Sequence, residues 1–342
     1  QRTLSGGNDS GGEEPLRTVA LTGATGFIGS HIAQALIQTG SDLHLYVRRT
    51  SPLIQALQKQ GASVYVGTGA DDVPMLGKAL EGADTVIHCA AATRALNRQA
   101  FYRANVAFTG RILSLLGRRQ RFLFISSQAV SGPSPRGIPL DETAPPAPVN
   151  AYGWSKHLAE RITRGWGREH DGNHVILRPS VVYGPREKDV FLLFKGIRKG
   201  VALLPGNGRQ RVSLLYVEDL VRAVLAALER WPRGQTCFVA GDESASWLEL
   251  ARLIQAAFSR HRVLKLRIPA ALAGTGAFFA DALSTMTGKP GILCRDKILE
   301  MRQEAWLCSN RRIKERLSWR PRVSLMAGVE KTAAWYLEAH WL

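Results

Sequence analysis

Apolar positions along the first half of the chain follow two alternating periods. Short runs rich in β-branched residues, such as residues 18–22 and 121–126, have the composition of buried strands. Between them, apolar residues recur at helical spacing, as in residues 30–38. The pattern predicts strands at 18–22, 43–47, 64–66, 85–89, 121–126 and 174–177, and helices at 30–38, 52–60, 75–80, 101–117 and 152–168. Strands and helices that alternate in this way form right-handed βαβ units, so we expect an α/β fold with a doubly wound parallel sheet, a Rossmann fold.

A glycine-rich turn joins the first predicted strand to the first predicted helix. Gly23, Gly26 and Gly29 stand at GxxGxxG spacing. Glycine permits a sharp turn, lets the backbone approach a pyrophosphate and lets the helix pack closely on the strand. The free N–H groups at the start of the helix favour an anion. This placement predicts a dinucleotide site.

The end of the second predicted strand indicates which dinucleotide binds. An NAD site places a carboxylate there for the ribose 2′-hydroxyl, whereas NADP requires a cation for the 2′-phosphate. Val47 occupies the acidic position, and Arg48 and Arg49 follow it. A guanidinium suits a phosphate monoester, so NADP(H) is favoured, with NAD(H) as the alternative. Either arginine could instead be a solvated surface residue.

Tyr152 and Lys156 stand four residues apart in a predicted helix, which puts both side chains on one face. A nearby ammonium stabilises a phenolate, so we expect Lys156 to lower the pKa of Tyr152. Ser126 and Ser127 close the strand at 121–126 and could supply a hydroxyl to the reacting oxygen. The alternative is that Tyr152 merely begins the helix and Lys156 is exposed.

After residue 180 the regular alternation ends, and the chain is expected to form a second lobe. Helices are predicted at 247–258 and 329–339. We expect a flexible lead over residues 1–16, a dinucleotide-binding domain over 17–180 to which 213–240 returns, and a smaller, mostly helical substrate lobe from 181–212 and 241–342. The apolar segment 268–280 is too short to span a bilayer. It could be a core or dimer-interface helix, line the substrate cleft or rest on a membrane surface.

The 342 residues carry a formal net charge of +17, but the basic residues are scattered along the chain. Nucleic-acid binders usually gather them on one arm or helix, so no nucleic-acid partner is expected. No transmembrane segment is predicted. The four cysteines form no CxxC pair, which indicates free thiols of the cytoplasm and no metal site.

Seven motifs occur in a characteristic order: TGATGFIG (22–29), IHCAAAT (87–93), NV (105–106), FISSQAV (124–130), YGWSK (152–156), LRPSVVYGPR (177–186) and LLYVEDL (214–220). Together they closely resemble the extended short-chain dehydrogenase/reductase superfamily, the NAD(P)-dependent epimerase/dehydratase group. The likeness covers nearly the whole chain. The motifs are specific for the superfamily and not for the substrate.

The resemblance implies a role for each matching residue. Tyr152 would be the acid/base, Lys156 the modulator of its pKa, and Ser127 the hydroxyl partner, with Ser126 as its rival. Asn105 would help to hold the active-site backbone. Asp219 would hold the two lobes together. The cofactor would contact Gly23, Thr25, Gly26, Phe27, Ile28, Gly29, Arg48, Arg49, Thr68, Gly69, Cys89, Ala90, Ala91, Ala92, Tyr152, Lys156, Pro179, Ser180 and Val182.

Three departures from the family pattern concern the ligands. Thr68 replaces an aspartate that reads the adenine amine in many members. Val181 replaces an asparagine, and Val212 an arginine, that contact the diphosphate in nucleotide-sugar enzymes, although Arg209 and Arg211 are close in sequence. These changes weaken the prediction of a nucleotide-sugar substrate without excluding it.

Three functions therefore remain open. The first is an NADP(H)-dependent reductase or dehydrogenase of an apolar or lightly polar alcohol or ketone, steroid-like or polyketide-like. The second is a nucleotide-sugar epimerase or dehydratase that retains its cofactor. The third is a non-catalytic dinucleotide-binding protein, which the intact Ser127, Tyr152 and Lys156 disfavour. A homodimer is expected from the resemblance.

Overall fold

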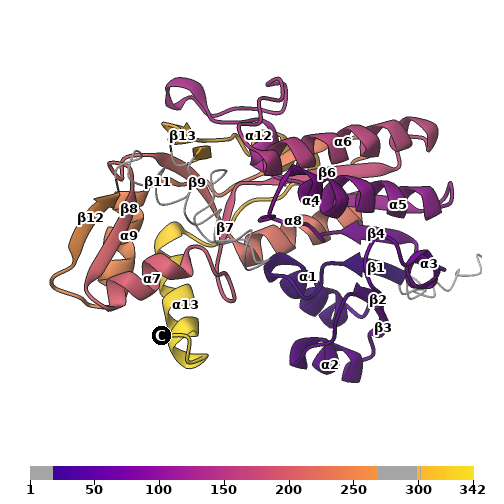
Figure 1. Cartoon of the computed structure of the whole chain (residues 1–342), viewed down its shortest axis with the longest axis horizontal. Coiled ribbons are helices and arrows are strands. Elements are labelled where there is room, and N and C mark those ends of the chain that lie inside the picture. The colour runs from indigo at the N-terminus through magenta and orange to yellow at the C-terminus, as the bar shows by residue number, and fades with distance from the viewer. Residues whose placement is uncertain (1–17, 269–298, 301) are drawn as a thin grey trace, which may run out of the picture.

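The computed structural model describes residues 18–268, 299–300 and 302–342. Its centre is a seven-stranded sheet in the order β10-β6-β5-β4-β1-β2-β3, and every neighbouring pair in it is parallel. The strands are β1 (Thr18–Thr22), β2 (Asp42–Val47), β3 (Ser63–Val66), β4 (Thr85–His88), β5 (Arg121–Ile125), β6 (His174–Pro179) and β10 (Thr236–Val239). The predicted Rossmann fold is confirmed (Figure 1).

Helices cover both faces of this sheet, because its strands are apolar on both sides. One face packs against α1 (Phe27–Gln38), α2 (Pro52–Lys59), α8 (Val217–Arg230) and α12 (Arg311–Leu317). The other packs against α3 (Val73–Leu80), α5 (Phe108–Leu115) and α6 (Ala151–Glu169). The carboxyl ends of the strands are therefore left for ligands.

The single helix predicted at 101–117 is divided into three parts. It begins earlier, as α4 (Arg98–Phe101), because Asn97 caps it by accepting a hydrogen bond from the Ala100 N–H at 2.8 Å. A π-helical turn over Tyr102–Ala107 follows, and then α5. Such turns often occur at functional sites. This one contains Asn105.

The second lobe combines helices with two small sheets. One sheet joins β7 (Val181–Tyr183), β9 (Arg211–Tyr216), β11 (Ser244–Ser246) and β13 (Ala305–Trp306), and the other pairs β8 (Val201–Pro205) with β12 (Leu264–Ile268). They share a core with α7 (Phe191–Arg198), α9 (Trp247–Ala257) and α13 (Leu325–Glu338). The sequence predicted a mostly helical lobe and missed these strands, because several are only two or three residues long.

Two later segments complete the nucleotide-binding half. Residues 217–239 supply α8 and β10, which lies beside β6. Ile313, Leu317 and Trp319 pack in the same core as α8, although they lie within residues 241–342, which the sequence assigned to the other lobe. The buried Asp219 carboxylate accepts hydrogen bonds from the N–H groups of Arg322 (2.7 Å) and Val323 (3.1 Å), and so ties the last segment to α8.

Within the described ranges, no helix is both long and apolar enough to cross a membrane. The predicted lead at 1–16 and all of segment 268–280 after Ile268 lie outside the described residues.

Candidate active site

The glycine-rich turn brings the start of α1 against the loop that follows β4. Gly23 has a φ of +86°, and a Cβ at this position would lie 2.6 Å from the Ala90 nitrogen. A Cβ on Gly29 would overlap the Gly23 carbonyl group. Only glycine fits either position without a backbone shift. No acidic residue lies in the first turn of α1, so its N–H groups can receive the phosphates of a dinucleotide.

A buried hydrogen-bond chain fixes the loop after β4. The Ala90 N–H donates to the Thr22 hydroxyl at 3.4 Å, and this hydroxyl lies 2.7 Å from His88 Nδ1. His88 Nε2 lies 3.0 Å from the Thr109 hydroxyl, which donates to the Asn105 carbonyl at 2.6 Å. Burial lowers the pKa of His88 well below its usual value, so the ring is neutral. A neutral ring can accept from Thr22 and donate to Thr109 at the same time.

Asn105 joins this loop to α6. Its amide oxygen accepts from the Ala92 N–H at 2.7 Å, and its nitrogen donates to the Ala92 carbonyl at 3.0 Å and to the Ser155 hydroxyl at 2.8 Å. Because Asn105 is 1% exposed, these bonds are shielded from water. Asn105 therefore holds the backbone around the site.

Tyr152 and Lys156 lie on one face of α6, as their spacing predicts. Lys156 is fully buried, donates to the Ile125 carbonyl at 2.6 Å, and lies 4.0 Å above the centre of the Phe124 ring. Burial lowers the pKa of Lys156 to about 8. The Tyr152 phenol is hydrogen-bonded to the Ser127 hydroxyl.

The direction of the Tyr152 pKa differs from the sequence-based expectation. Burial raises the pKa of Tyr152 to about 12, and the hydrogen bond with Ser127 offsets only part of this effect. The lowering expected from the Lys156 ammonium was wrong for this arrangement, because desolvation dominates and the group that lowers the pKa is Ser127. The phenol therefore keeps its proton at neutral pH.

The two neighbouring serines have different partners. Ser126 is buried and donates to the Glu160 carboxylate at 2.6 Å, whereas Ser127 faces Tyr152. Arg178 donates to both Glu160 oxygens, at 2.8 and 2.6 Å, and Arg164 donates at 2.8 Å. These partners lower the pKa of Glu160 despite its burial, so it remains a carboxylate. Ser126 is thus hydrogen-bonded to a buried ion pair and Ser127 to the Tyr152 phenol, and both serines line the cavity described below.

Gly153, which the sequence analysis did not single out, lets α6 approach the chain after β5. A Cβ on Gly153 would lie 2.7 Å from the Ala129 carbonyl oxygen. The Asn150 side chain caps α6 by accepting from the Gly153 N–H at 2.8 Å. This close packing brings Tyr152 to Ser127.

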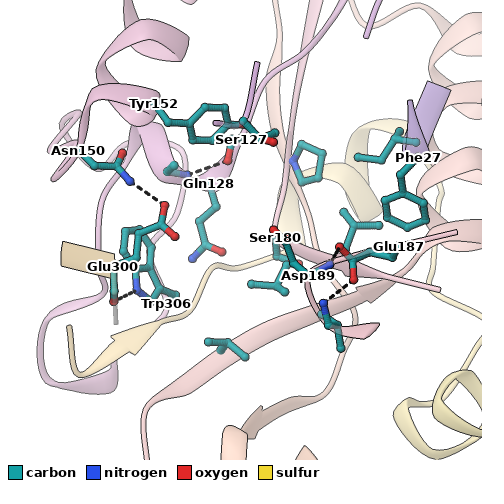
Figure 2. A pocket seen from close by; sticks show the side chains of 18 of the residues that line it. Phe27, Ser127, Gln128, Asn150, Tyr152, Ser180, Glu187, Asp189, Glu300 and Trp306 are labelled. Carbon is teal, nitrogen blue, oxygen red and sulfur yellow. Dashed lines mark hydrogen bonds between the residues drawn. The ribbon is translucent and has the colours of Figure 1, made fainter. Parts of the chain in front are cut away.

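A cavity of about 360 Å³ opens beside these residues, between the two lobes. Tyr152, Ser127 and Gln128 lie on one side of it, with Phe27 and Glu187 on the other (Figure 2). Seven predicted cofactor or catalytic residues line it: Phe27, Ile28, Ser127, Tyr152, Pro179, Ser180 and Val182. The other predicted residues of this region are not among the lining residues, and the contacts above join several of them to one another: Gly23, Gly26, Gly29, the loop 89–92, Asn105 and Lys156.

The far end of the cavity is built from residues that no sequence motif revealed. The Asn150 amide donates to the Glu300 carboxylate at 2.7 Å, and Trp306 Nε1 donates to the Glu300 carbonyl at 3.1 Å (Figure 2). Trp247 Nε1 donates to the Gln210 side chain at 2.9 Å. These residues come from separate parts of the chain, so no local pattern could have brought them together.

The four residues predicted near the adenosine lie apart from this cavity. Arg48 and Arg49 are exposed just after β2, and the Arg48 side chain reaches towards Gly69. The Tyr46 hydroxyl donates to the Gly69 carbonyl at 2.7 Å and accepts from the Gly69 N–H at 3.2 Å. Thr68 offers its N–H to the Asp72 carboxylate at 3.1 Å. Tyr46, missed at the sequence level, therefore shapes this loop.

The parallel sheet, the glycine turn and the Tyr–Lys face define an extended short-chain dehydrogenase/reductase, an enzyme that uses a nicotinamide cofactor. The family model described as "NAD dependent epimerase/dehydratase family" matches residues 19–241. The chain belongs to this family, and the predicted resemblance is confirmed.

Relatives in the family have different activities. The chain is 28% identical to a ceramide reductase of Caulobacter vibrioides over 332 residues, which cover 95% of this chain and 96% of that protein. It is 28% identical to N-acetyl-alpha-D-glucosaminyl-diphospho-ditrans,octacis-undecaprenol 4-epimerase of Escherichia coli O157:H7, over 79% of this chain and 81% of that protein. Its fold is similar to that of dTDP-glucose 4,6-dehydratase from Bacillus anthracis, with a TM-score of 0.79, 18% identity, and coverage of 94% of this chain and 97% of that one.

Proposed function

We propose that the protein is an NADP(H)-dependent reductase that transfers a hydride between the nicotinamide and the carbonyl or carbinol carbon of an apolar or lightly polar substrate. One observation carries this proposal. Val181 and Val212, which stand where nucleotide-sugar enzymes resembling this chain have polar diphosphate ligands, both line the cavity. Two tryptophans, Trp247 and Trp306, line it with them. This wall suits a hydrocarbon rather than a diphosphate.

The charges around the cavity support the same conclusion. Arg94 is the one lysine or arginine among the described lining residues, and it forms an ion pair with Asp189. Glu187 and Glu300 also line the cavity. A diphosphate would therefore meet carboxylates with no unpaired cation among the described lining residues.

The arginines near Val212 in the sequence do not compensate. Arg211 donates to the Ser244 carbonyl and hydroxyl, both at 2.9 Å, and pairs with Glu249 at 3.5 Å. Neither Arg211 nor Arg209 lines the described cavity. The similarity to a ceramide reductase along nearly the whole of both chains supports a lipid-like ketone as the substrate class.

Each residue of the Tyr152 cluster has a task in this reaction. The bound dinucleotide supplies the hydride. Tyr152 keeps its proton at neutral pH and donates it to the carbonyl oxygen as that oxygen gains charge. Ser127, hydrogen-bonded to the phenol, orients the same oxygen. Lys156 places a positive charge behind them, and Asn105 is a positioning residue through Ala92 and Ser155.

The cofactor would lie along the strand ends. Its pyrophosphate would rest on Gly23, Thr25, Gly26 and the start of α1, and its nicotinamide near Pro179 and Ser180. At the adenosine end, Arg48 and Arg49 would face the 2′-phosphate of NADP(H), which supports NADP(H) over NAD(H).

A nucleotide-sugar or polyprenyl-diphosphate-sugar epimerase is the second candidate, favoured by relatives such as the Escherichia coli 4-epimerase. Such an enzyme regenerates its cofactor within each cycle. Native mass spectrometry of the purified protein discriminates between the two. A nicotinamide cofactor that survives purification would favour the epimerase, and an empty protein that then takes up NADPH would favour the reductase.

The direct test measures NADPH oxidation with a long-chain ketone that bears a neutral polar headgroup, beside conversion of UDP-glucose. We expect oxidation with the ketone and no conversion of the sugar. Tyr152→Phe should abolish turnover while NADPH affinity stays within a few fold. Tyr102→Phe is the matched control, because this phenol is 53% exposed and does not line the active-site cavity. Conversion of the sugar without ketone reduction would overturn the proposal.

A further inference from the structure

The strand pair β8–β12 lies at the opposite end of the molecule from β3 (Figure 1), and one side of the pair is apolar. Leu266 pairs with Leu203, and Leu264 with Val201, so these side chains share one side of the pair. Leu203, Leu264 and Leu266 are 56%, 60% and 43% exposed. We call these three residues the leucine face.

The other side of β8 is an ordinary core. Ala202 and Leu204 are buried there, in the cluster that contains residues of α7 and α9. The strand pair is therefore anchored through its inner side, and the leucine face contributes little to the described core. Charged side chains on an edge strand discourage pairing with other chains. Lys265 and Arg267 pair with Ala202 and Leu204, so they leave β12 on the side opposite the leucine face. Their charges could serve this role, but three exposed leucines on one side could not.

The segments of the chain that contain the leucine face carry only positive charge. Residues 190–217 and 250–268 contain no aspartate or glutamate. Lys199, Arg262, Lys265 and Arg267 are exposed, and none of them forms an ion pair with a described residue. The segregation lies in the absence of acidic residues from these two segments, whereas an exposed arginine of α12, Arg311, pairs with Glu315.

We propose that the leucine face, with the exposed Lys199 and Arg262 just before β8 and β12, docks the protein on an anionic lipid bilayer. Leucine side chains that enter the boundary of the acyl chains gain from burial, and lysine and arginine at the headgroup level gain from the negative surface potential. A second copy of the chain is a poorer occupant, since it would bring an equally basic surface against this one. The proposal is independent of the reaction assigned to the active site.

Sedimentation of the whole protein with lipid vesicles tests this docking without cofactor or substrate. We expect binding to vesicles of phosphatidylcholine that contain phosphatidylglycerol, weaker binding to phosphatidylcholine alone, and loss of binding as salt is raised. Lys199→Gln with Arg262→Gln should lower the partition coefficient about thirty-fold. Leu264→Ser with Leu266→Ser should lower it by at least about tenfold at the same net charge.

The control for bulk charge is Arg118→Gln with Arg119→Gln, two exposed arginines just before β5 in the nucleotide-binding half. This variant loses the same charge and should bind within about threefold of the wild type. Equal losses in the two charge variants would overturn the proposal, as would absence of binding to anionic vesicles. If the leucine variants changed the oligomeric state and left vesicle binding intact, the face would be an interface between copies, and the proposal would be wrong.

Discussion

The Lys156 ammonium donates a 2.6 Å hydrogen bond to the carbonyl of Ile125, the last residue of β5. Ser126 and Ser127 follow directly, so the lysine on α6 fixes the end of the strand that presents both hydroxyls. Because the ammonium is fully buried, its proton is held less tightly than that of a surface lysine. The charge beside the proposed proton donor therefore changes within an accessible pH range.

The rate of ketone reduction should be level around neutral pH and fall as the pH rises through about 8. Burial lowers the pKa of Lys156 to about 8, so the ammonium is present below that pH and lost above it. The pKa of Tyr152, raised to about 12, keeps the phenol protonated throughout. A profile of kcat/KM against pH checks this, because it reports on the free enzyme. A level profile up to pH about 10 would contradict the role of the ammonium.

Ser127→Ala should affect mainly the rate of the reaction, and Ser126→Ala mainly the stability of the fold. Loss of the Ser127 hydroxyl should lower kcat about 10²- to 10³-fold, the usual effect of removing one donor from a reacting oxygen. Loss of the Ser126 hydroxyl should cost stability, about 1 kcal/mol, because Glu160 loses one of its buried donors. Steady-state kinetics and urea unfolding of both variants provide the comparison. The reverse pattern would assign the reacting hydroxyl to Ser126.

Arg48→Ala with Arg49→Ala should raise the Kd for NADPH far more than that for NADH, because only NADPH carries the 2′-phosphate. Titration of protein fluorescence with each cofactor measures both constants. Lys59→Ala is the control, because it removes an exposed cation at the end of the neighbouring helix α2. It should change neither the Kd for NADPH nor that for NADH. Equal losses for the two cofactors would show that these arginines do not read the phosphate.

Glu160→Gln should destabilise the fold by about 3 to 5 kcal/mol, since it leaves the buried Arg178 guanidinium without a counter-charge. Replacement of both residues with methionine should recover part of this loss, because a buried ion pair can be exchanged for well-packed apolar side chains. Urea unfolding of the single and double variants measures the difference. A single variant within about 1 kcal/mol of the wild type would show that water reaches the pair.

Local patterns were sufficient for much of the fold. Strands such as β1 and β5 and the helices α1 and α6 begin and end within a few residues of their predicted bounds. In these elements, the apolar residues that set the sequence pattern are also the residues that the fold buries. The pattern failed at the π-helical turn that contains Asn105, because apolar spacing does not distinguish such a turn from an α-helix. It also failed at β11 and β13, which are too short to show a period. The NADP preference and the homodimer stay predictions.

The sequence by itself determined the glycine turn at Gly23 and the placement of Tyr152 and Lys156 on one face, because both follow from spacing within a few residues. Tertiary structure decided the partners of the two adjacent serines, since the packing of β5 against α6 brings Ser126 to Glu160 and Ser127 to Tyr152. It also decided the direction of the Tyr152 pKa, which depends on burial. The cavity wall required the fold as well, because it brings Val181 and Val212 together from β7 and β9.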